Sequence, residues 1–381
     1  MAEYDTSHVK NVVLLGHAGS GKTTLAECML FEAGIINRRG KVEEKNTVSD
    51  FHVIEKERGN SIFCKLLHTK WRGYKINIID TPGYDDFAGE VVSALRVADT
   101  GIMLLNAEMG VEVGTDIIWD YTESFKTPMI FAVNKLDSEN ADFDRTVSEA
   151  KKHFGPNVLT VQYPLNQGES FDSIIDVLMM VMYKFPATGG KPEKLPIPEE
   201  EKTKADFLHK ELIEAIAGND EQLMEKYFDK GELDENEMRN GLKSSMIKHD
   251  LFPLFCLSAE RNMGSGRLMG FIDNVCPSAN EMPPQTARQG EKVLPDAAGP
   301  ACIFVFKTIS ESHVGEMSLF KVYSGVVRTG MELVNESTSN LERLNQLYTV
   351  EGNNRTNVNE LVAGDIGATI KLKNTHVNNT L

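Results

Sequence analysis

A glycine-rich loop near the N-terminus has the residue types needed to hold a chain of phosphates. Residues 16–23 spell GHAGSGKT, which fits the pattern G-x-x-x-x-G-K-[ST], and they join an apolar run to a helical pattern that opens at Thr24. In such a loop the backbone N–H groups surround phosphate oxygens, Lys22 reaches the β- and γ-phosphates, and the Thr23 hydroxyl binds Mg²⁺. A glycine-rich turn without a ligand is the alternative. The predicted nucleotide contacts from this loop are His17, Ala18, Gly19, Ser20, Gly21, Lys22, Thr23 and Thr24.

A second motif, Asp80-Thr81-Pro82-Gly83, directly follows the apolar run 76–79. Open α/β sheets bind ligands at the carboxyl ends of their strands, so the Asp80 carboxylate is placed to hold a water of a bound Mg²⁺. The backbone N–H of Gly83, which has no side chain to keep it away, can approach a γ-phosphate and so sense its presence. A Pro-Gly turn with an aspartate that caps a helix is the alternative interpretation of this motif.

A third motif predicts which base is bound. Residues 134–137 spell NKLD after an apolar run, and an aspartate carboxylate in this position accepts two hydrogen bonds from the edge of guanine. Adenine would leave that buried acceptor unpaired, a mismatch worth about 10⁴-fold or more in selectivity. After the apolar run 251–257, a backbone N–H of the Ser-Ala pair is placed to meet the guanine carbonyl oxygen. An enzyme that uses ATP is the alternative. The predicted base contacts are Asn134, Lys135, Asp137, Ser258 and Ala259.

These motifs need short buried strands that end at one edge of a sheet. Short apolar runs, mostly of β-branched residues and leucine, recur in the first half of the chain, each followed by a polar or glycine turn and a stretch with helical spacing. Such runs are typical of buried parallel strands. We therefore predict an α/β fold with the doubly wound, mostly parallel sheet of a P-loop GTPase. The predicted strands are 12–15, 76–79, 102–105 and 130–133.

The regular alternation stops after about residue 155. In residues 191–240 acidic side chains outnumber basic ones by 15 to 8, and 204–227 has the spacing of one amphipathic helix, so we predict an inserted α+β subdomain. The Met-rich run 177–183 is predicted to be a core strand. Beyond a proline-rich stretch, strand-like runs alternate with glycine turns, which predicts an incomplete antiparallel β-barrel. The predicted division is 1–160 and 251–280 for the GTP-binding domain, 161–250 for the inserted subdomain, 281–299 for the linker and 300–381 for the β-barrel.

Composition limits the partners and the compartment. The chain has 381 residues and a formal net charge of −16, so long-range attraction to nucleic-acid phosphates or to anionic membranes cannot drive its binding. Its 5 cysteines are dispersed and form no C-x-x-C pair, which excludes a zinc ribbon or a disulfide framework and suits a reducing compartment. No apolar stretch approaches the roughly 20 residues that span a bilayer. We expect a cytoplasmic protein that does not contact a membrane.

The order of the motifs resembles that of the translational GTPases, and most closely that of the elongation factor G family. Residues 57–62 (ERGNSI) resemble the end of the family's switch I, 212–227 its inserted subdomain, and 322–330 and 363–368 its second, β-barrel domain. The likeness runs over almost the whole chain but covers only the first two domains of factor G, which would continue through three more. The chain therefore looks like the N-terminal domains of a divergent paralogue of factor G.

The resemblance implies GTP and GDP as ligands, Mg²⁺ as the cofactor, and the ribosome, through its RNA and its proteins, as the partner of a protein that is monomeric off the ribosome. The implied function is translocation or ribosome release with GTP as the switch ligand. The alternative is a GTP-bound regulatory or ribosome-protection factor with little turnover. The implied metal ligands are Thr23, Ser61 and Asp80, and the catalytic candidates are Lys22, Gly83 and Tyr84.

The chain departs from the family's pattern around the position of the attacking water. Residues 18–19 replace Ile-Asp in the phosphate loop, Ser61 replaces threonine, and Tyr84 replaces the catalytic histidine. Tyrosine, with a reference pKa of about 10 against about 6.5 for histidine, orients water without carrying a positive charge. We therefore expect nucleotide binding to be intact and hydrolysis to be slow. The alternative is that Tyr84, Asp85 or Asp86 orients water well enough once the ribosome orders the switch.

Overall fold

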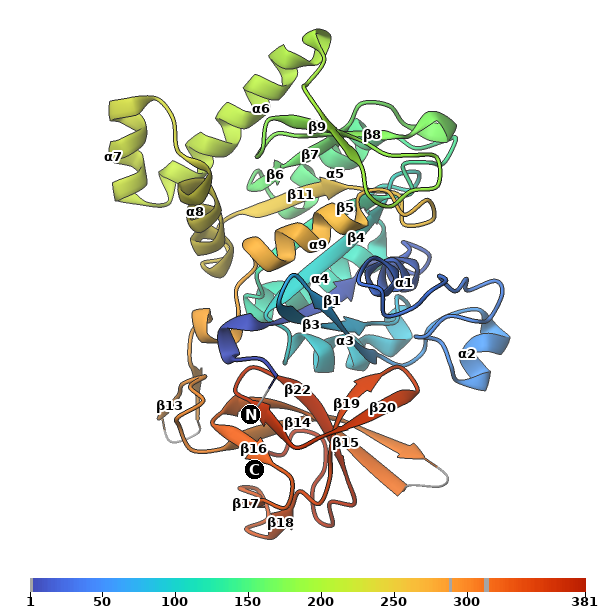
Figure 1. The fold of residues 1–381 in the computed structure, drawn as a ribbon, viewed down its shortest axis with the longest axis vertical. Helices are drawn as coiled ribbons and strands as arrows, with labels where there is room; N and C mark the ends of the chain where they lie inside the picture. The colour runs from blue at the N-terminus through green and yellow to red at the C-terminus, as the bar shows by residue number, and fades with distance from the viewer. Residues whose placement is uncertain (1–2, 288–289, 312–314) are drawn as a thin grey trace.

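The structure, a computed structural model, describes three stretches of the chain: residues 3–287, 290–311 and 315–381. The other residues, which fall in the predicted GTP-binding domain, linker and β-barrel, lie outside the described part: 1–2, 288–289 and 312–314. Figure 1 shows a central α/β layer, with the helices of the inserted segment above it and the C-terminal strands below it.

The central layer is built on a seven-stranded sheet in the order β2-β3-β1-β4-β5-β11-β6. Its strands are β1 Val9–Leu15, β2 Lys65–Trp71, β3 Tyr74–Asp80, β4 Thr100–Asn106, β5 Met129–Asn134, β6 Val158–Thr160 and β11 Phe252–Cys256. All neighbours pair in parallel except β2 and β3, so the predicted, mostly parallel α/β fold is confirmed. Every residue of β1 and β4 is buried, which explains the apolar runs 12–15 and 102–105 within them, although β1 also carries the buried polar residues Lys10 and Asn11. The antiparallel edge strand β2 was not predicted because exposed polar residues interrupt its apolar pattern.

Helices pack against this sheet in pairs, α1 with α9 and α3 with α4, while α5 packs against β5. Their bounds are α1 Lys22–Glu32, α3 Ala88–Leu95, α4 Val113–Phe125, α5 Phe143–Phe154 and α9 Ser265–Asn274. The short helix α2, Val53–Arg58, lies between α1 and β2 at the edge of the layer (Figure 1). The start of α5 is fixed by Asp142, whose side chain accepts a hydrogen bond from the backbone N–H of Arg145.

A buried histidine ties the end of α4 to the chain that leads into β11. His249 Nδ1 lies 2.8 Å from the Thr127 carbonyl oxygen, and His249 Nε2 lies 2.7 Å from Glu123 Oε1. Burial raises the pKa of the Glu123 carboxyl, but hydrogen bonds from Lys126 and His249 outweigh that effect and lower the pKa below its usual value. The ionised carboxylate is therefore the form that the folded protein favours.

We expect the change Glu123→Gln to lower the free energy of unfolding by about 1–2 kcal/mol, because an amide replaces a charged partner of a buried imidazole. Urea unfolding at pH 7 measures this difference. Since the pKa is lowered on folding, the carboxylate contributes stability above its unfolded pKa of about 4.3, and the contribution is lost as the pH falls further. Equal stabilities of the two proteins at pH 7 would contradict the prediction.

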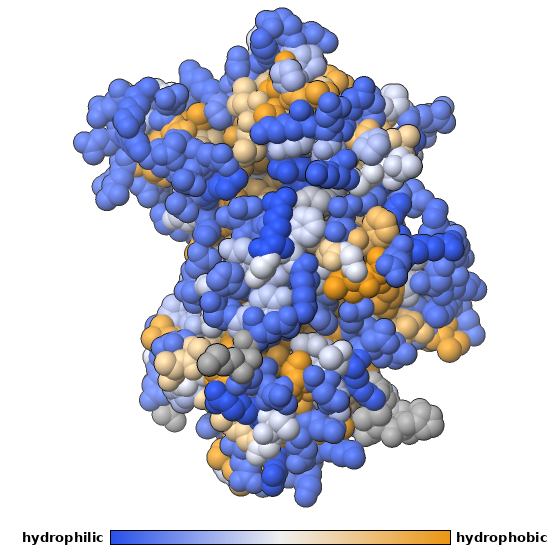
Figure 2. Space-filling model, viewed as in Figure 1, coloured by the Kyte–Doolittle hydropathy of each residue, from blue (hydrophilic) through white to orange (hydrophobic). Residues whose placement is uncertain are grey.

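The inserted segment contains a small antiparallel sheet and three helices. Its strands follow the order β10-β9-β8-β7, and the surface over its outer helices is largely hydrophilic (Figure 2). The acidic side chains of this segment therefore face water, as their number suggested. The elements are β7 Gln162–Pro164, β8 Ser173–Asp176, β9 Val181–Lys184, β10 Glu193–Leu195, α6 Glu199–Gly218, α7 Glu221–Lys230 and α8 Glu235–Ile247.

Two predictions in this segment are wrong. The single helix 204–227 is two helices, because Asp220 caps α7 by accepting hydrogen bonds from the N–H groups of Gln222 and Leu223. The single strand 177–183 is a turn followed by β9, with Met180 in the left-handed region at a φ of 49°. Local turn chemistry overrode the apolar pattern in both places.

The C-terminal part consists of antiparallel sheets, as predicted. Its five-stranded sheet has the order β14-β15-β22-β19-β20 and is accompanied by the pairs β16-β21 and β17-β18, while β12-β13 lies in the connecting stretch. The strands are β12 Gln285–Thr286, β13 Lys292–Val293, β14 Cys302–Glu311, β15 Gly315–Ser324, β16 Val326–Arg328, β17 Glu332–Val334, β18 Leu341–Arg343, β19 Leu347–Glu351, β20 Asn354–Val358, β21 Glu360–Val362 and β22 Ile366–Ile370.

Buried ion pairs hold the C-terminal strands β14 to β22, which we call the β-domain, against the central sheet. Lys75 Nζ lies 2.7 Å from Asp365 Oδ1, and all four side chains of this pair and of the Lys321–Asp99 pair are less than a tenth exposed. A third contact involves α3: the Glu90 carboxylate accepts hydrogen bonds from Lys307 of the β-domain and, at 2.6 Å, from the backbone N–H of Cys64. In the described part of the chain, no helix has the length and apolar character needed to cross a membrane.

Candidate nucleotide-binding site

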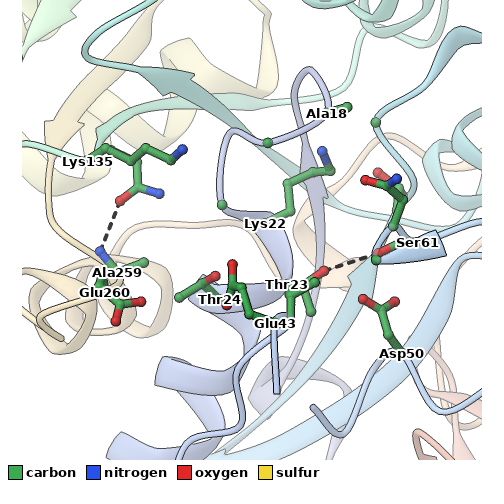
Figure 3. Close-up of a pocket in the computed structure, with 18 of the residues that line it drawn as sticks. Ala18, Lys22, Thr23, Thr24, Glu43, Asp50, Ser61, Lys135, Ala259 and Glu260 are labelled. Carbon is green, nitrogen blue, oxygen red and sulfur yellow. Dashed lines mark hydrogen bonds between the residues drawn. The ribbon is translucent and has the colours of Figure 1, made fainter. Parts of the chain in front are cut away.

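A cavity of about 480 Å³ lies at the carboxyl edge of the central sheet, beside the start of α1. Its lining comes from the loops after β1, β3, β4, β5 and β11 and from the segment between α1 and β2. Parallel strands end together at this edge, which is why motifs far apart in the sequence meet here. In Figure 3, Thr23, Ser61 and Asp50 lie on one side of the cavity, and Ala259 and Glu260 lie on the opposite side.

The phosphate loop has a backbone shape that glycine adopts most readily. Gly16, Gly19 and Gly21 have φ angles of 132°, 80° and 97°. A Cβ on Gly21 would lie 2.3 Å from Asn134 Nδ2, so this position also lacks room for a side chain. No side chain caps α1, which begins at Lys22, so its N-terminal N–H groups are left for phosphate oxygens.

Lys22 is buried at the base of this loop. Its Nζ donates hydrogen bonds to the carbonyl oxygens of Gly16 at 2.7 Å and His17 at 2.9 Å. Burial lowers the pKa of Lys22 from its ordinary value to about 8. A Cβ on Gly83 would lie 2.5 Å from Lys22 Nζ and 2.5 Å from Ala18 N, so position 83 can hold only a glycine in this arrangement.

The side of the cavity predicted to hold the metal contains three hydroxyls and two carboxylates. Thr23 Oγ1 donates to Asp80 Oδ2 at 2.8 Å and lies 3.2 Å from Ser61 Oγ. The third hydroxyl, that of Ser49, donates to the same Asp80 oxygen at 2.6 Å. Burial, followed by the charge of Asp80, raises the pKa of Asp50 to about 7, and burial raises the pKa of Asp80.

These residues fit a hard divalent cation. The Oδ1 atoms of Asp50 and Asp80 are buried without a hydrogen-bond partner among the described residues, which is the arrangement that a cation or its waters would satisfy. The described residues contain no group of three or more His, Cys, Asp or Glu side chains able to hold a metal by themselves. An ion here would therefore take its other ligands from hydroxyls, water and phosphate oxygens.

The opposite side of the cavity is organised by Asn134. Its Nδ2 donates to the Ser20 carbonyl oxygen at 2.8 Å, and its Oδ1 accepts the backbone N–H of Ala259 at 2.9 Å, the contact drawn in Figure 3. Asn134 thus joins the phosphate loop to the loop after β11. We expected a backbone N–H of the Ser-Ala pair to meet a guanine carbonyl oxygen, but both are already engaged: the N–H of Ser258 donates to the Met263 carbonyl oxygen at 2.9 Å, and that of Ala259 donates to Asn134. Asp137 lies nearby, with Oδ1 buried and without a partner among the described residues.

Not every predicted site residue lines the cavity. Four of them do not contribute to its lining: His17, Ser20, Asp80 and Ser258. His17 Nε2 is 3.5 Å from Glu112 Oε1. Tyr84 stands at the cavity wall with a 44% exposed side chain. The predicted residues that do line the cavity are Ala18, Gly19, Gly21, Lys22, Thr23, Thr24, Ser61, Gly83, Tyr84, Asn134, Lys135, Asp137 and Ala259.

A group of lining residues, most of them acidic or polar, was not predicted from the sequence. Most of them belong to the segment between α1 and β2, or directly follow a predicted motif. Those that follow a motif could have been predicted by including the residues next to it. The missed lining residues are Val42, Glu43, Asp50, Gly59, Asn60, Thr81, Glu108, Ser138 and Glu260.

Both parts of the chain match families of known proteins. Residues 7–278 match the family model of the elongation factor Tu GTP binding domain, and residues 300–381 match that of elongation factor G domain 2. Elongation factor G 2 of Syntrophomonas wolfei subsp. wolfei is 32% identical over 384 residues, covering 99% of this chain and 55% of that protein.

Among solved structures, the fold is similar to a crystal structure of a protein from Thermus thermophilus, with a TM-score of 0.88 and 30% sequence identity. The match covers 98% of this chain and 54% of that one. The chain thus spans about half the length of the curated relative and of the solved structure that it matches.

Proposed function

This chain belongs to the elongation factor G family of translational GTPases, and from that premise we propose that it binds GTP and GDP with Mg²⁺ and acts on the ribosome in translocation or ribosome release. One observation carries the proposal: three buried carboxylate oxygens in or beside one cavity, Oδ1 of Asp50, Asp80 and Asp137, have no partner among the described residues. Unpaired buried acceptors are costly, so each calls for a donor or a cation from outside the chain.

In this proposal the two ends of the nucleotide lie on opposite sides of the cavity. Lys22 and the N-terminus of α1 bind the phosphates, and the hydroxyls of Thr23 and Ser61 hold Mg²⁺, with Asp80 and Asp50 beside its waters. Bound Mg²⁺ would neutralise charge on the phosphate oxygens. Asp137 accepts hydrogen bonds from the guanine edge, and Gly83 is the backbone sensor of the γ-phosphate.

We further propose the domain division given above, with a GTP-binding domain of 1–160 and 251–280, an inserted subdomain of 161–250, a linker of 281–299 and a β-barrel of 300–381. The two family matches, which end at 278 and begin at 300, support the linker. The protein would work in the cytoplasm as a monomer when it is off the ribosome.

Hydrolysis is proposed to be slow because of Tyr84. Its position at the cavity wall suits a side chain that hydrogen-bonds to an attacking water, and a phenol does so without a positive charge. We expect ribosomes to accelerate GTP hydrolysis by the complete gene product, and the change Tyr84→His to raise the ribosome-stimulated rate by about tenfold or more. Single-turnover release of phosphate measures both effects.

The matched control is Tyr84→Phe, which keeps the ring and removes the hydroxyl, and which should lower the rate further. Hydrolysis by the unsubstituted protein as fast as that of a factor with histidine at this position would contradict slow turnover. An absence of any acceleration by ribosomes would contradict the proposed function as a ribosomal GTPase.

Tyr84 also favours a second candidate, a GTP-bound ribosome-associated regulatory or protection factor with little turnover. That protein would remain on ribosomes with one GTP per molecule and release almost no phosphate. Measuring retained GTP alongside ribosome occupancy separates the two candidates.

A further inference from the structure

An arginine outside the nucleotide motifs joins three parts of the site. Arg39 lies in the segment between α1 and α2, and its Nη1 donates to the carbonyl oxygens of Ala259 and Glu260, both at 2.9 Å. The same nitrogen lies 3.5 Å from Cys28 Sγ on α1. We call residues 258–262 the base loop, because Ala259 and Glu260 line the side of the cavity where the guanine is proposed to sit.

The contact at Ala259 is more than a surface hydrogen bond. Burial raises the pKa of Cys28 to about 11, so its thiol keeps a proton and donates it to the Ala259 carbonyl oxygen at 2.9 Å. That oxygen therefore accepts from Cys28 and Arg39 together. Because a trans peptide places its N–H opposite its carbonyl, fixing this oxygen also fixes the direction of the Glu260 N–H. Arg39 and Cys28 together therefore fix the direction in which the Glu260 N–H points.

Arg39 sits at the start of a loop that covers the cavity. We call residues 37–48 the cover loop. It is fastened to Glu27 of α1 at two points, because Glu27 Oε2 accepts the backbone N–H of Gly40 at 2.7 Å and Oε1 accepts that of Val48, the last residue of the loop, at 2.6 Å. Between these two anchors, Val42 and Glu43 line the cavity. The cover loop therefore forms part of the cavity wall, and Arg39 connects it to the base loop.

We propose that Arg39 is a positioning residue that fastens the cover loop to the base loop, so that closure over the nucleotide and recognition of the guanine 6-oxygen form one cooperative unit. The proposal rests on the proposed guanine-nucleotide function and adds to it a residue that sets nucleotide retention and base selectivity. The exposed Lys41–Glu260 ion pair joins the same two loops but contributes little, because both of its charges are largely solvated.

The test uses the dissociation rate of a fluorescent GDP analogue and the preference for GDP over the diphosphate of 2-aminopurine riboside, which lacks the 6-oxygen. We expect Arg39→Ala to speed dissociation by about fivefold or more and to reduce the preference for GDP, because the loss of a charged donor to two carbonyl groups frees the base loop. Arg39→Lys, which keeps one donor group, should fall between Arg39→Ala and the unsubstituted protein. Arg38→Ala is the matched control, because Arg38 is 80% exposed and pairs only with Glu44 among the described residues.

Unchanged dissociation and unchanged base preference in both Arg39 variants, with tight GDP binding by the unsubstituted protein, would overturn the proposal and leave the proposed function standing. Faster dissociation with an unchanged base preference would also overturn it, because general loosening has that effect without positioning of the base loop. If Arg39→Ala fails to fold, Arg39→Lys decides by the same two measurements. A failure of the unsubstituted protein to bind any guanine nucleotide would instead overturn the proposed function itself.

Discussion

Replacing Asp137 with asparagine is expected to weaken the binding of GDP by about 10³-fold or more, while strengthening the binding of xanthosine diphosphate. A carboxylate accepts hydrogen bonds from both the N1–H and the 2-amino group of guanine. An asparagine amide turns one acceptor into a donor, which opposes the 2-amino group but suits the 2-oxygen of xanthine. Titration calorimetry with the two diphosphates measures the change, and the unpaired Asp137 Oδ1 is the structural reason to expect it.

The matched control for this experiment is Asp144→Asn, because that carboxylate is 83% exposed and lies on the outside of α5. It should leave both affinities unchanged. If Asp137→Asn bound GDP as tightly as the unsubstituted protein, the base would have to be recognised elsewhere, and the assignment of this side of the cavity to guanine would be wrong.

The second large effect is expected at Lys22. Replacing it with methionine keeps most of the side-chain volume and removes the buried charge, so the affinity for GTP and GDP should fall by about 100-fold or more, in line with the 2–5 kcal/mol lost when one member of a buried charge pair is removed. Because burial already disfavours the charge of Lys22 in the nucleotide-free protein, the same change should cost little stability.

Thermal unfolding without nucleotide measures whether Lys22→Met costs stability. The matched control for the binding experiment is Lys152→Met, a change at an exposed position of α5. A collapse of stability in Lys22→Met would mean that the lysine mainly supports the loop through the Gly16 and His17 carbonyl groups. Full affinity in a stable Lys22→Met protein would contradict phosphate binding by this side chain.

The parts of the fold that could be predicted are those with local signals. The apolar runs before residues 16, 80 and 134 are strands because both faces of the sheet are covered, which makes most positions along them apolar. Asn77 is a buried polar exception, and its Nδ2 donates to Asn11 Oδ1 and Asp365 Oδ1. The break at Asp220 also had a local signal, a Gly-Asn-Asp sequence, which the apolar spacing on both sides concealed. The hairpin turn ending at Met180 had a weaker signal, because no glycine, proline or asparagine marks it and only Asp176, whose Oδ1 accepts the backbone N–H of Met179, favours a turn.

The candidate site likewise contains residues that could be predicted from the sequence and residues that could not. Residues within glycine or aspartate motifs were predictable because backbone shape and ligand chemistry demand those residue types at fixed spacing. Asp50 and Arg39 were not predictable as parts of the site, because neither belongs to a motif. Long-range contacts position them, such as those from Glu27 to Gly40 and Val48. The position of a segment without apolar periodicity is set by the residues that it packs against, and those long-range contacts cannot be predicted from one sequence.

The two hydrogen bonds accepted by Glu90 connect the β-domain to the phosphate side of the cavity. One carboxylate joins α3, the backbone at Cys64 just beyond Ser61, and Lys307 of the β-domain. A displacement of the backbone near Ser61 would therefore act on the same carboxylate that holds Lys307 of the β-domain. We expect the position of the β-domain to respond, through this contact, to a change on the phosphate side of the cavity.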